Sequence, residues 1–390
     1  MAHLSARLAL LSGNFITGLA VLAPSGMLTE LSADLGVSVR DVGLLVTYGA
    51  VVLCVGSPVV SWLTTRIGRR LLLSGTLAIL AFGHVLSAAA DSYGAILGLR
   101  LAMLTFAAIY TPQAASTMAL IVAEKDRPAA LAFVFLGWSL AIAVGLPLIT
   151  LFANEFGWRG TYAAIGIAAA VSAALNAASL PGRLQGHPLS LQSFVDIAKS
   201  RTLMLILLIT LLQMSGQFSI TIYMAALVQQ VAGGGPAAAG LLFSLLGAAG
   251  LIGNLVATRI VQRAGVNRTL GFFILVMTTG ALTFAFGTGI LAAMAAGVFI
   301  LGLGITAGNS MQQARLVAAD PLLASATVAL NTSVLYVGQA LGSGAAGFLY
   351  QYEYYRLIGF LSVSFFALAF VVFALSVSVR RGGKFETVRH

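Results

Sequence analysis

Long apolar runs, separated by short polar segments, make up most of the chain. Twelve runs of about 20 residues or more recur along the 390 residues, and about 20 apolar residues are what a helix needs to cross a bilayer. The runs are too long for transmembrane strands and do not alternate between apolar and polar positions. The pattern predicts an all-α polytopic membrane protein. Its twelve transmembrane helices are expected at 8–29, 42–63, 71–90, 94–120, 129–153, 159–180, 202–228, 238–262, 269–288, 290–314, 325–349 and 355–379.

The composition favours lipid as the surrounding solvent. Hydrophobic residues make up 59% of the chain and charged residues 8%, and the mean hydropathy is +0.99. A soluble domain is about 45–50% apolar and about 25% charged, so a soluble core could not bury this much apolar surface. The first run is too long for a signal peptide and contains Pro24. It also lacks a clear small-x-small cleavage site, so we interpret it as a span.

Basic residues are distributed unevenly between alternate loops. With the N-terminus in the cytoplasm, 17 of the 21 Lys and Arg residues fall on the cytoplasmic side, three fall outside and Arg100 alone lies within a span. Basic residues resist translocation, so this bias predicts cytoplasmic termini. Short loops facing an anionic leaflet account for the net charge of +10, and nucleic-acid binding is a poor interpretation. The cytoplasmic set is Arg7, Arg66, Arg69, Arg70, Lys125, Arg127, Arg183, Lys199, Arg201, Arg259, Arg263, Arg268, Arg315, Arg380, Arg381, Lys384 and Arg389, and the outer set is Arg40, Arg159 and Arg356.

The sequence offers no pattern typical of an enzyme. Cys54 is the only cysteine, and the four histidines are scattered, so no spacing suggests a zinc site. No phosphate loop, dinucleotide fingerprint or Gly-x-Ser-x-Gly motif lies between a strand and a helix. We therefore expect no enzyme activity, no metal and no cofactor.

An internal repeat appears when the chain is shifted by 197 residues. Several glycines and arginines then coincide. Glycine matches alone would be weak evidence in a chain with 43 glycines, but arginine matches in corresponding loops are less easily explained by chance. The only long polar stretch, 181–201, separates the two copies. We expect an N-terminal six-helix bundle at 1–180, a cytoplasmic linker at 181–201 and a C-terminal bundle with a short tail at 202–390. The matched pairs are Arg66 and Arg263, Gly68 and Gly265, Gly43 and Gly240, Gly56 and Gly253, Gly145 and Gly342, and Arg159 and Arg356.

The loop after the second run carries a short basic motif. The sequence "WLTTRIGRR", from Trp62 to Arg70, resembles together with Ser61 the loop signature G-x-x-x-D-R-x-G-R-R of the major facilitator superfamily. Serine stands where glycine is usual, and threonine stands at 65 where aspartate is usual. The matching residues are Arg66, Gly68, Arg69 and Arg70.

Three further stretches resemble the same superfamily. The segment 137–148, "GWSLAIAVGLPL", is similar to the span-five signature of drug:proton antiporters, while 156–166 and 33–50 are similar to sugar and arabinose efflux permeases. The resemblance covers essentially the whole chain. It implies the major facilitator fold of two six-helix pseudo-repeats, in a monomer of the bacterial inner (plasma) membrane. The span-five positions, read as a helix-packing motif, are Gly137, Ala141, Gly145 and Pro147.

The resemblance also implies a gating role for the basic loop. In the family, the loop arginines pair with acids and helix ends, and such pairs form and break as the two halves rock. The alternative is that these arginines only determine topology. Threonine at 65 can form a hydrogen bond but supplies no fixed negative charge. The expected gating residues are Thr65, Arg66, Gly68, Arg69, Arg70 and Arg263.

Polar side chains inside the spans are the candidates for a substrate cavity. Gln213, Gln217 and Thr221 follow each other at four-residue intervals and so share one face of a helix. Unpaired amides in lipid cost several kcal/mol, so these side chains should face the protein interior. The alternative is that many of them form hydrogen bonds between helices. The candidates are Asn14, Thr17, Tyr48, Tyr110, Gln113, Trp138, Gln213, Gln217, Thr221, Tyr223, Asn309, Gln313, Asn331, Tyr336 and Gln339.

Ionisable groups leave proton coupling open. All eleven acids fall in predicted loops or at span ends, so no midplane carboxylate is available as a proton carrier. Two ionisable residues remain within the predicted spans. Arg100, which resembles the family's span-four arginine, is a functional candidate but could also extend toward the outer interface. His84 could carry a proton or be a packed core histidine.

The leading hypothesis is an alternating-access transporter that exports a small, mostly neutral polar solute, such as a sugar, a nucleoside or a drug-like compound. An uptake carrier or facilitator is the alternative within transport. A non-transporting membrane receptor is the alternative from another class, and it predicts no solvent-accessible central cavity.

Overall fold

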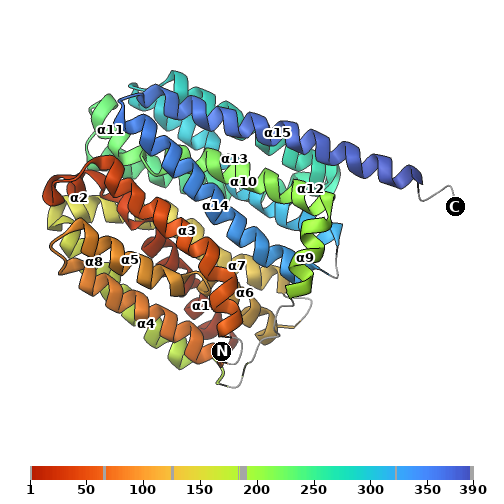
Figure 1. Ribbon diagram of the computed structural model, residues 1–390, viewed down its shortest axis with the longest axis horizontal. Helices are drawn as coiled ribbons and strands as arrows, with labels where there is room; N and C mark the ends of the chain where they lie inside the picture. The colour runs from red at the N-terminus through yellow and green to blue at the C-terminus, as the bar shows by residue number, and fades with distance from the viewer. Residues whose placement is uncertain are drawn as a thin grey trace. The chain divides into compact units, whose positions relative to one another are not determined.

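The computed structural model describes residues 2–64, 67–123, 127–182, 184, 191–320 and 323–386, and every regular element in these ranges is helical. The prediction of an all-α protein is thus confirmed (Figure 1). The helices are α1 (Ala2–Leu22), the 3₁₀ turn η1 (Ala23–Gly26), α2 (Leu28–Leu35), α3 (Val39–Leu63), α4 (Arg69–Ala88), α5 (Tyr93–Ala107), α6 (Tyr110–Ile121), α7 (Arg127–Leu140), the π-helical turn η3 (Ala141–Gly145), α8 (Leu146–Ser179), α9 (Leu191–Lys199), α10 (Arg201–Thr221), α11 (Met224–Ala232), α12 (Pro236–Phe286), α13 (Leu291–Ala319), α14 (Ala324–Gln351) and α15 (Tyr355–Glu386).

Nine helical segments of the described ranges are long and apolar enough to cross a membrane. Two of them contain 47 and 51 residues, and 51 helical residues would be about 77 Å long against a hydrocarbon core of about 30 Å. Each consists of two helices joined at a glycine with positive φ, 70° at Gly157 and 76° at Gly265. Both glycines fall in gaps between predicted spans. With α14 at the remaining predicted span, helices cover all the spans that the sequence predicted.

The first, fourth and seventh predicted spans are interrupted, whereas the sequence predicted continuous helices. Pro24 lacks an amide hydrogen and explains the first interruption. The residues at the other two interruptions are mostly apolar, so hydropathy alone does not reveal them. The interruptions lie between Leu22 and Leu28, between Ala107 and Tyr110, and between Thr221 and Met224.

The structure extends the internal repeat. α2 and α11 end at Gly36 and Gly233, which lie 197 positions apart and adopt left-handed conformations with φ of 63° and 61°. Such a glycine is a common helix C-terminus. Gly56 and Gly253 both allow a close approach of a neighbouring helix. A Cβ atom would lie 3.1 Å from Thr105 O at Gly56 and 1.8 Å from Leu303 O at Gly253. Both halves therefore cross their helices at corresponding glycines.

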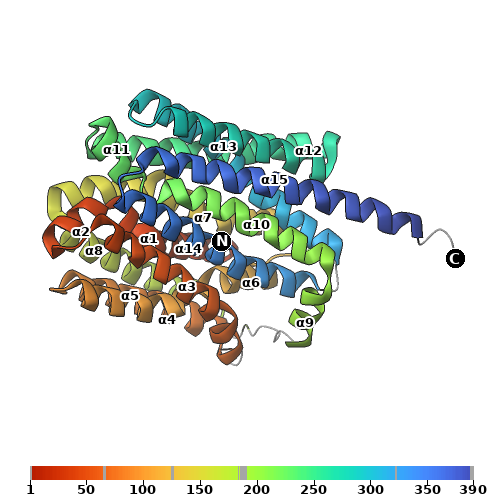
Figure 2. The ribbon, with the colours of Figure 1, turned by 45° about the horizontal axis from the view of Figure 1, so that its top comes forward.

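The described contacts divide the chain into two compact units. Unit 1 comprises Met1–Pro188 and Ile222–Gly247, and unit 2 comprises Leu189–Thr221 and Ala248–His390. In unit 1, α4 and α8 lie side by side, and α1 packs against α7 and α8 (Figure 1). In unit 2, α10 packs against both α14 and α15 (Figure 2). The predicted division at 181–201 remains a prediction.

The predicted linker contains the short helix α9. Its Ile197 is fully buried and packs in unit 2 against Leu203, Ile206 and Leu316. α9 thus belongs to the apolar core of unit 2 rather than to a purely polar connection.

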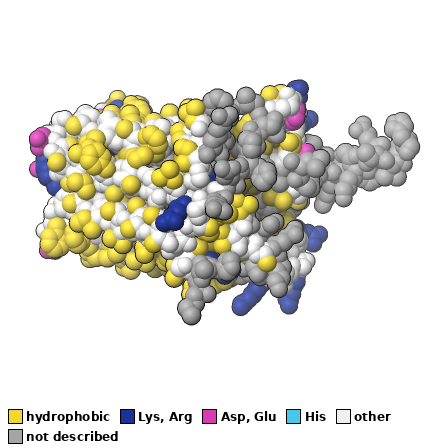
Figure 3. Space-filling view, turned by 90° about the horizontal axis from the view of Figure 1, so that it is seen from below, with side chains coloured by type: hydrophobic (Ala, Val, Ile, Leu, Met, Phe, Trp, Pro, Cys, Tyr) yellow, Lys and Arg dark blue, Asp and Glu magenta, His cyan; other side chains and the backbone are white. Residues whose placement is uncertain are grey.

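Large apolar side chains cover much of the surface. In the face shown in Figure 3, hydrophobic side chains predominate, and most of the visible charged side chains lie toward the left and right edges of the view. Leu71, Phe82 and Leu255 are each about two-thirds exposed or more, at 71%, 67% and 67%. Contiguous apolar surface of this kind is rare on soluble monomers and suits contact with lipid.

Candidate functional site

Four buried amide side chains lie on two neighbouring helices of unit 2, and we call them the amide set. Gln213 and Gln217 lie on α10, Asn331 and Gln339 lie on α14, and none is more than 3% exposed. Within the described part of the chain, both amide atoms of Gln213 lack a hydrogen-bond partner. The same holds for Gln217 Oε1, Asn331 Oδ1 and Gln339 Nε2. Each buried polar group without a partner costs about 1–3 kcal/mol.

Close packing joins the two helices that carry the amide set. A Cβ atom at Gly338 or Gly342 of α14 would lie 2.5 Å from Leu211 O or 2.2 Å from Ser215 O, so α14 approaches the α10 backbone directly. Small residues permit such an approach between membrane helices. On α13, a Cβ atom at Gly308 would lie 3.2 Å from Gln213 Nε2. The unpartnered atoms include both donors and acceptors, and the residues themselves are uncharged.

Three predicted cavity residues of unit 1, Asn14, Tyr110 and Trp138, differ because hydrogen bonds between helices satisfy them. Asn14 donates to Val134 O at 3.0 Å and accepts from Thr111 Oγ1 at 2.8 Å. Trp138 Nε1 donates to Thr111 Oγ1 at 3.0 Å. Tyr110 donates to Asn176 Oδ1 at 2.9 Å. The alternative interpretation, hydrogen bonding between helices rather than lining of a cavity, therefore applies to these residues. Their hydrogen bonds join α1, α6, α7 and α8.

The other cavity candidates are less uniform. Thr17 and Thr221 are buried and donate to carbonyls of their own helices. Tyr223 is fully buried in unit 1, and Tyr336 is 6% exposed. Tyr48 is 44% exposed. The half-buried candidates are Gln113, Asn309 and Gln313.

Arg100 does not extend toward the surface, so that alternative is wrong. Its side chain is 1% exposed. Nε donates to Leu45 O at 2.7 Å, Nη1 donates to Ala20 O at 2.9 Å and Nη2 donates to Val21 O. The guanidinium thus binds backbone carbonyls of α1 and α3.

His84 is buried as a core histidine would be. It is fully inaccessible, and its Nδ1 lies 2.7 Å from Leu80 O. Its ring centroid lies 5.7 Å from that of Tyr162 on α8. These contacts favour packing between α4 and α8 over a role as proton carrier.

Arg315 is a buried residue that sequence reasoning missed. The sequence predicted that Arg315 lies in a loop and that Arg100 is the only arginine within a span. Both predictions are wrong, because α13 continues to Ala319 and includes Arg315. Arg315 is 3% exposed and donates to Gln312 Oε1 at 2.9 Å and Ser376 Oγ at 2.6 Å. The apolar residues that follow it, at 316–319, were the available signal.

The expected gating residues are only partly visible. Thr65 and Arg66 lie outside the described residues. Arg69 is 7% exposed, its Nη2 lies 3.5 Å from Ser116 Oγ and its backbone amide donates to Leu184 O at 3.0 Å. Gly68 precedes it as the N-terminal boundary of α4, while Arg70 and Arg263 are exposed. The gating role remains a prediction.

The span-five motif lies at close helix crossings. A Cβ atom at Gly137 would lie 2.5 Å from Leu11 O, and one at Gly145 would lie 2.2 Å from Leu19 Cδ2. Ala141 begins the π-helical turn η3, which Pro147 follows closely. A proline cannot donate the next helical hydrogen bond, and a local π-helical adjustment is one way in which a membrane helix satisfies the backbone groups that a proline leaves free.

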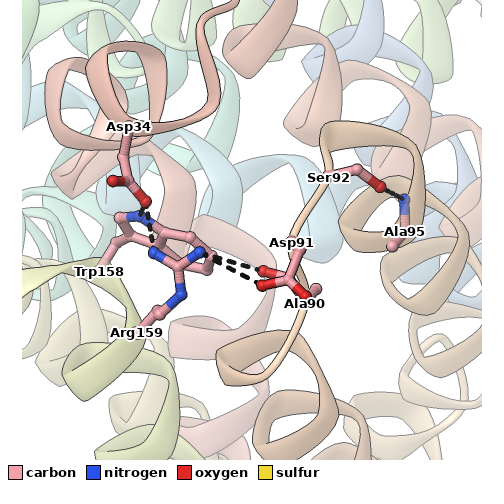
Figure 4. A network of polar contacts seen from close by, with 7 residues as sticks. All are labelled: Asp34, Ala90, Asp91, Ser92, Ala95, Trp158 and Arg159. Atoms are coloured by element: carbon pink, nitrogen blue, oxygen red, sulfur yellow. Dashed lines mark hydrogen bonds and ion pairs between the residues drawn. The ribbon is translucent and has the colours of Figure 1, made fainter.

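A polar network joins three segments at one end of unit 1 (Figure 4). Asp34 accepts hydrogen bonds from Trp158 Nε1 at 2.8 Å and from Arg159 Nη1. The Arg159 guanidinium also lies 3.8 Å from Asp91 Oδ1 and 4.2 Å from the Trp158 ring centroid. A cavity of about 330 Å³ adjoins the network. Its lining comprises Glu30, Asp34, Ala153, Phe156, Gly157, Trp158 and Arg159.

We predict that acid loosens this network. The hydrogen bonds from Trp158 and Arg159 lower the pKa of Asp34 below its ordinary value of 3.8. Ionised Asp34 therefore stabilises the fold above the unfolded pKa of about 3.9, and the stabilisation is lost as pH falls through the lower folded pKa. Between pH 6 and pH 3, the melting temperature should fall less in Asp34→Asn than in the unmodified protein. Asp91→Asn is the control, since its side chain is 96% exposed. Equal pH dependence in all three proteins would contradict the prediction.

Comparison with known proteins identifies relatives along most of the chain. The family model of the Major Facilitator Superfamily matches residues 10–332. A probable sugar efflux transporter of Mannheimia succiniciproducens is 26% identical over 332 residues, covering 85% of this chain and 83% of its own. Another, from Helicobacter pylori, is 27% identical over 331 residues, covering 85% and 84%. The crystal structure of a D-xylose–proton symporter shares the fold with a TM-score of 0.77 at 16% identity, covering 95% of this chain and 97% of that one.

Proposed function

Since this chain belongs to the major facilitator superfamily, a family of membrane transporters of small molecules, we propose that it exports a small, neutral, hydroxyl-rich solute by alternating access. The observation that carries the proposal is the amide set of unit 2, in which five buried donor and acceptor atoms have no partner in the described chain. A bound solute would satisfy them.

The chemistry of the amide set supports a hydroxyl-rich substrate. A hydroxyl group both donates and accepts hydrogen bonds, and an amide offers both functions on one side chain. No member of the set carries charge, so an ionic substrate gains no counter-charge there. A site that hydrogen-bonds substrate hydroxyls also discriminates strongly against analogues that lack them. The names of two relatives, probable sugar efflux transporters, support a sugar-like solute and the outward direction.

Two features of the mechanism belong to the proposal as well. We expect a monomer that couples only weakly to protons, because the acids lie at helix ends or in loops and His84 is packed between helices. We also expect the basic loop at 65–70 to stabilise one state of the carrier through charges that pair and separate as the units move.

Counterflow in proteoliposomes tests the proposal. Purified protein is reconstituted, and a panel of labelled pentoses, hexoses and nucleosides is screened first by thermal shift and then by flux. Saturable flux of a neutral polyhydroxy solute is expected, with accumulation driven by its own gradient. An imposed pH gradient should change the flux little. Binding without flux would favour a receptor, and the absence of both binding and flux for every member of the panel would exclude the proposed substrate class.

We predict that the termini and the 181–201 segment are cytoplasmic, because 17 basic residues share that side. After replacement of Cys54, a cysteine at Gly186 should react with an impermeant thiol reagent only from the cytoplasmic side. A cysteine at the exposed Ser38 should react only from the outside. Outside labelling at Gly186 would reverse the proposed orientation.

A further inference from the structure

The first span ends in a way that frees backbone carbonyls inside the protein. α1 stops at Leu22, and Pro24 lies in the following 3₁₀ turn. In a continuous α-helix, residue 24 would donate to Ala20 O and residue 25 to Val21 O. Proline has no amide hydrogen, and the 3₁₀ turn redirects the next donor to a nearer carbonyl. Both oxygens therefore need other donors, since an unsatisfied carbonyl at membrane depth costs several kcal/mol.

Arg100 supplies these donors from a different helix. Its Nη1 binds Ala20 O at 2.9 Å and its Nη2 binds Val21 O, the two carbonyls that the turn frees. Its Nε binds Leu45 O at 2.7 Å, which adds α3 to the same contact. The planar fork of a guanidinium suits three acceptors held at fixed angles. One side chain thus holds the end of α1 against both α3 and α5.

The same geometry explains how a buried cation is tolerated without an acid. Ala20 and Val21 belong to the last turn of α1, and the carbonyl end of a helix carries a partial negative charge of about half a unit. The described contacts of the Arg100 guanidinium are with backbone carbonyl oxygens and not with a carboxylate. The helix end therefore serves as the counter-charge of Arg100.

We propose that Arg100 is a positioning residue that replaces the hydrogen bonds lost at Pro24 and thereby maintains the break in the first span. It does not bind the substrate as a fixed positive charge. The break sets where α1 ends and where η1 and α2 begin. Arg100 therefore maintains the arrangement of the unit 1 helices that transport requires.

A double-mutant cycle between Arg100 and Pro24 tests the inference. Arg100→Met leaves the carbonyls unsatisfied. Pro24→Ala restores an amide hydrogen and lets α1 continue as an α-helix. We expect Arg100→Met to lower the melting temperature in detergent clearly. The Arg100→Met/Pro24→Ala double mutant should regain at least about half of that loss, because contacting sites are non-additive. Arg100→Met/Pro147→Ala is the matched control, since it removes another in-span proline and should regain nothing.

Two further readouts keep the inference testable if Arg100→Met folds poorly. Arg100→Lys supplies a point charge without the fork, and Pro24→Ala should also raise its melting temperature. With labelled D-xylose as the probe, Arg100→Lys should lower the maximal counterflow at least about tenfold and change KM by no more than about twofold. If the probe is not carried, the stability cycle alone decides. Additive stability effects, or a large rise in KM with an unchanged maximal rate, would overturn the inference.

Discussion

Replacing Gln213 and Gln217 of the amide set by leucine is expected to abolish transport while making the protein more stable. Both side chains are buried, and their unpartnered atoms cost about 1–3 kcal/mol each in the empty protein. Leucine removes that cost, so the melting temperature should rise. It also removes the hydrogen bonds to a bound solute, and a site that hydrogen-bonds a substrate hydroxyl discriminates by about four to five orders of magnitude against an analogue without it. We therefore expect counterflow to fall at least about 100-fold.

A matched control is available in the same unit. Gln312 is also a fully buried glutamine, but its Nε2 donates to Ile206 O at 2.9 Å and its Oε1 accepts from Arg315. Gln312→Leu should lower the melting temperature, because it leaves those partners unsatisfied. Opposite signs of the stability change for Gln213 and Gln312 would therefore mark the difference between a ligand group and a structural one. A fall in stability for Gln213→Leu together with intact transport would remove Gln213 from the proposed site.

The helices could be predicted from the sequence because hydropathy and length act locally. The glycines that join two helices, Gly157 and Gly265, fall between apolar runs of the sequence, and charged residues lie near both. The interruption at Pro24 was less accessible to prediction. Its stability depends on Arg100, which lies about 80 positions further along the chain, and hydropathy contains no information about such a partner.

The candidate cavity residues show the same limit. Asn14 and Gln213 look alike in sequence, as single amides within apolar runs. Asn14 finds partners 97 and 120 positions away, while the amide of Gln213 finds none in the described chain. Only the packing of helices separates these cases. Arg315 was misplaced for a different reason, since a charged residue near a helix end is usually exposed and here Ser376 and Phe373 of α15 contact it.

Gly43→Ala is expected to shift the conformational equilibrium of the carrier. Gly43 on α3 contacts Tyr223, which lies within unit 1 at the break between α10 and α11. A Cβ atom at Gly43 would lie 2.0 Å from the Tyr223 oxygen and 2.6 Å from Cζ. The ring is fully buried, so it must move or the two segments must separate. Overpacking of this kind costs about 1–3 kcal/mol, which displaces a two-state equilibrium by about 5- to 150-fold.

The internal repeat provides the control for this prediction. Gly240 is the repeat partner of Gly43, but a Cβ atom there would meet Pro147 at 3.6 Å, an ordinary contact. Spin labels at the exposed positions Ser38 and Gly235, introduced after replacement of Cys54, would report the separation of α3 from the 222–247 segment. We expect longer distances in Gly43→Ala, unchanged distances in Gly240→Ala, and a return toward the original distribution in Gly43→Ala/Tyr223→Ala. Tyr223→Ala can relieve the strain of Gly43→Ala only if the added methyl group contacts the Tyr223 ring. A double mutant with distances as long as those of Gly43→Ala alone would therefore show that the methyl group acts on α3 through another contact.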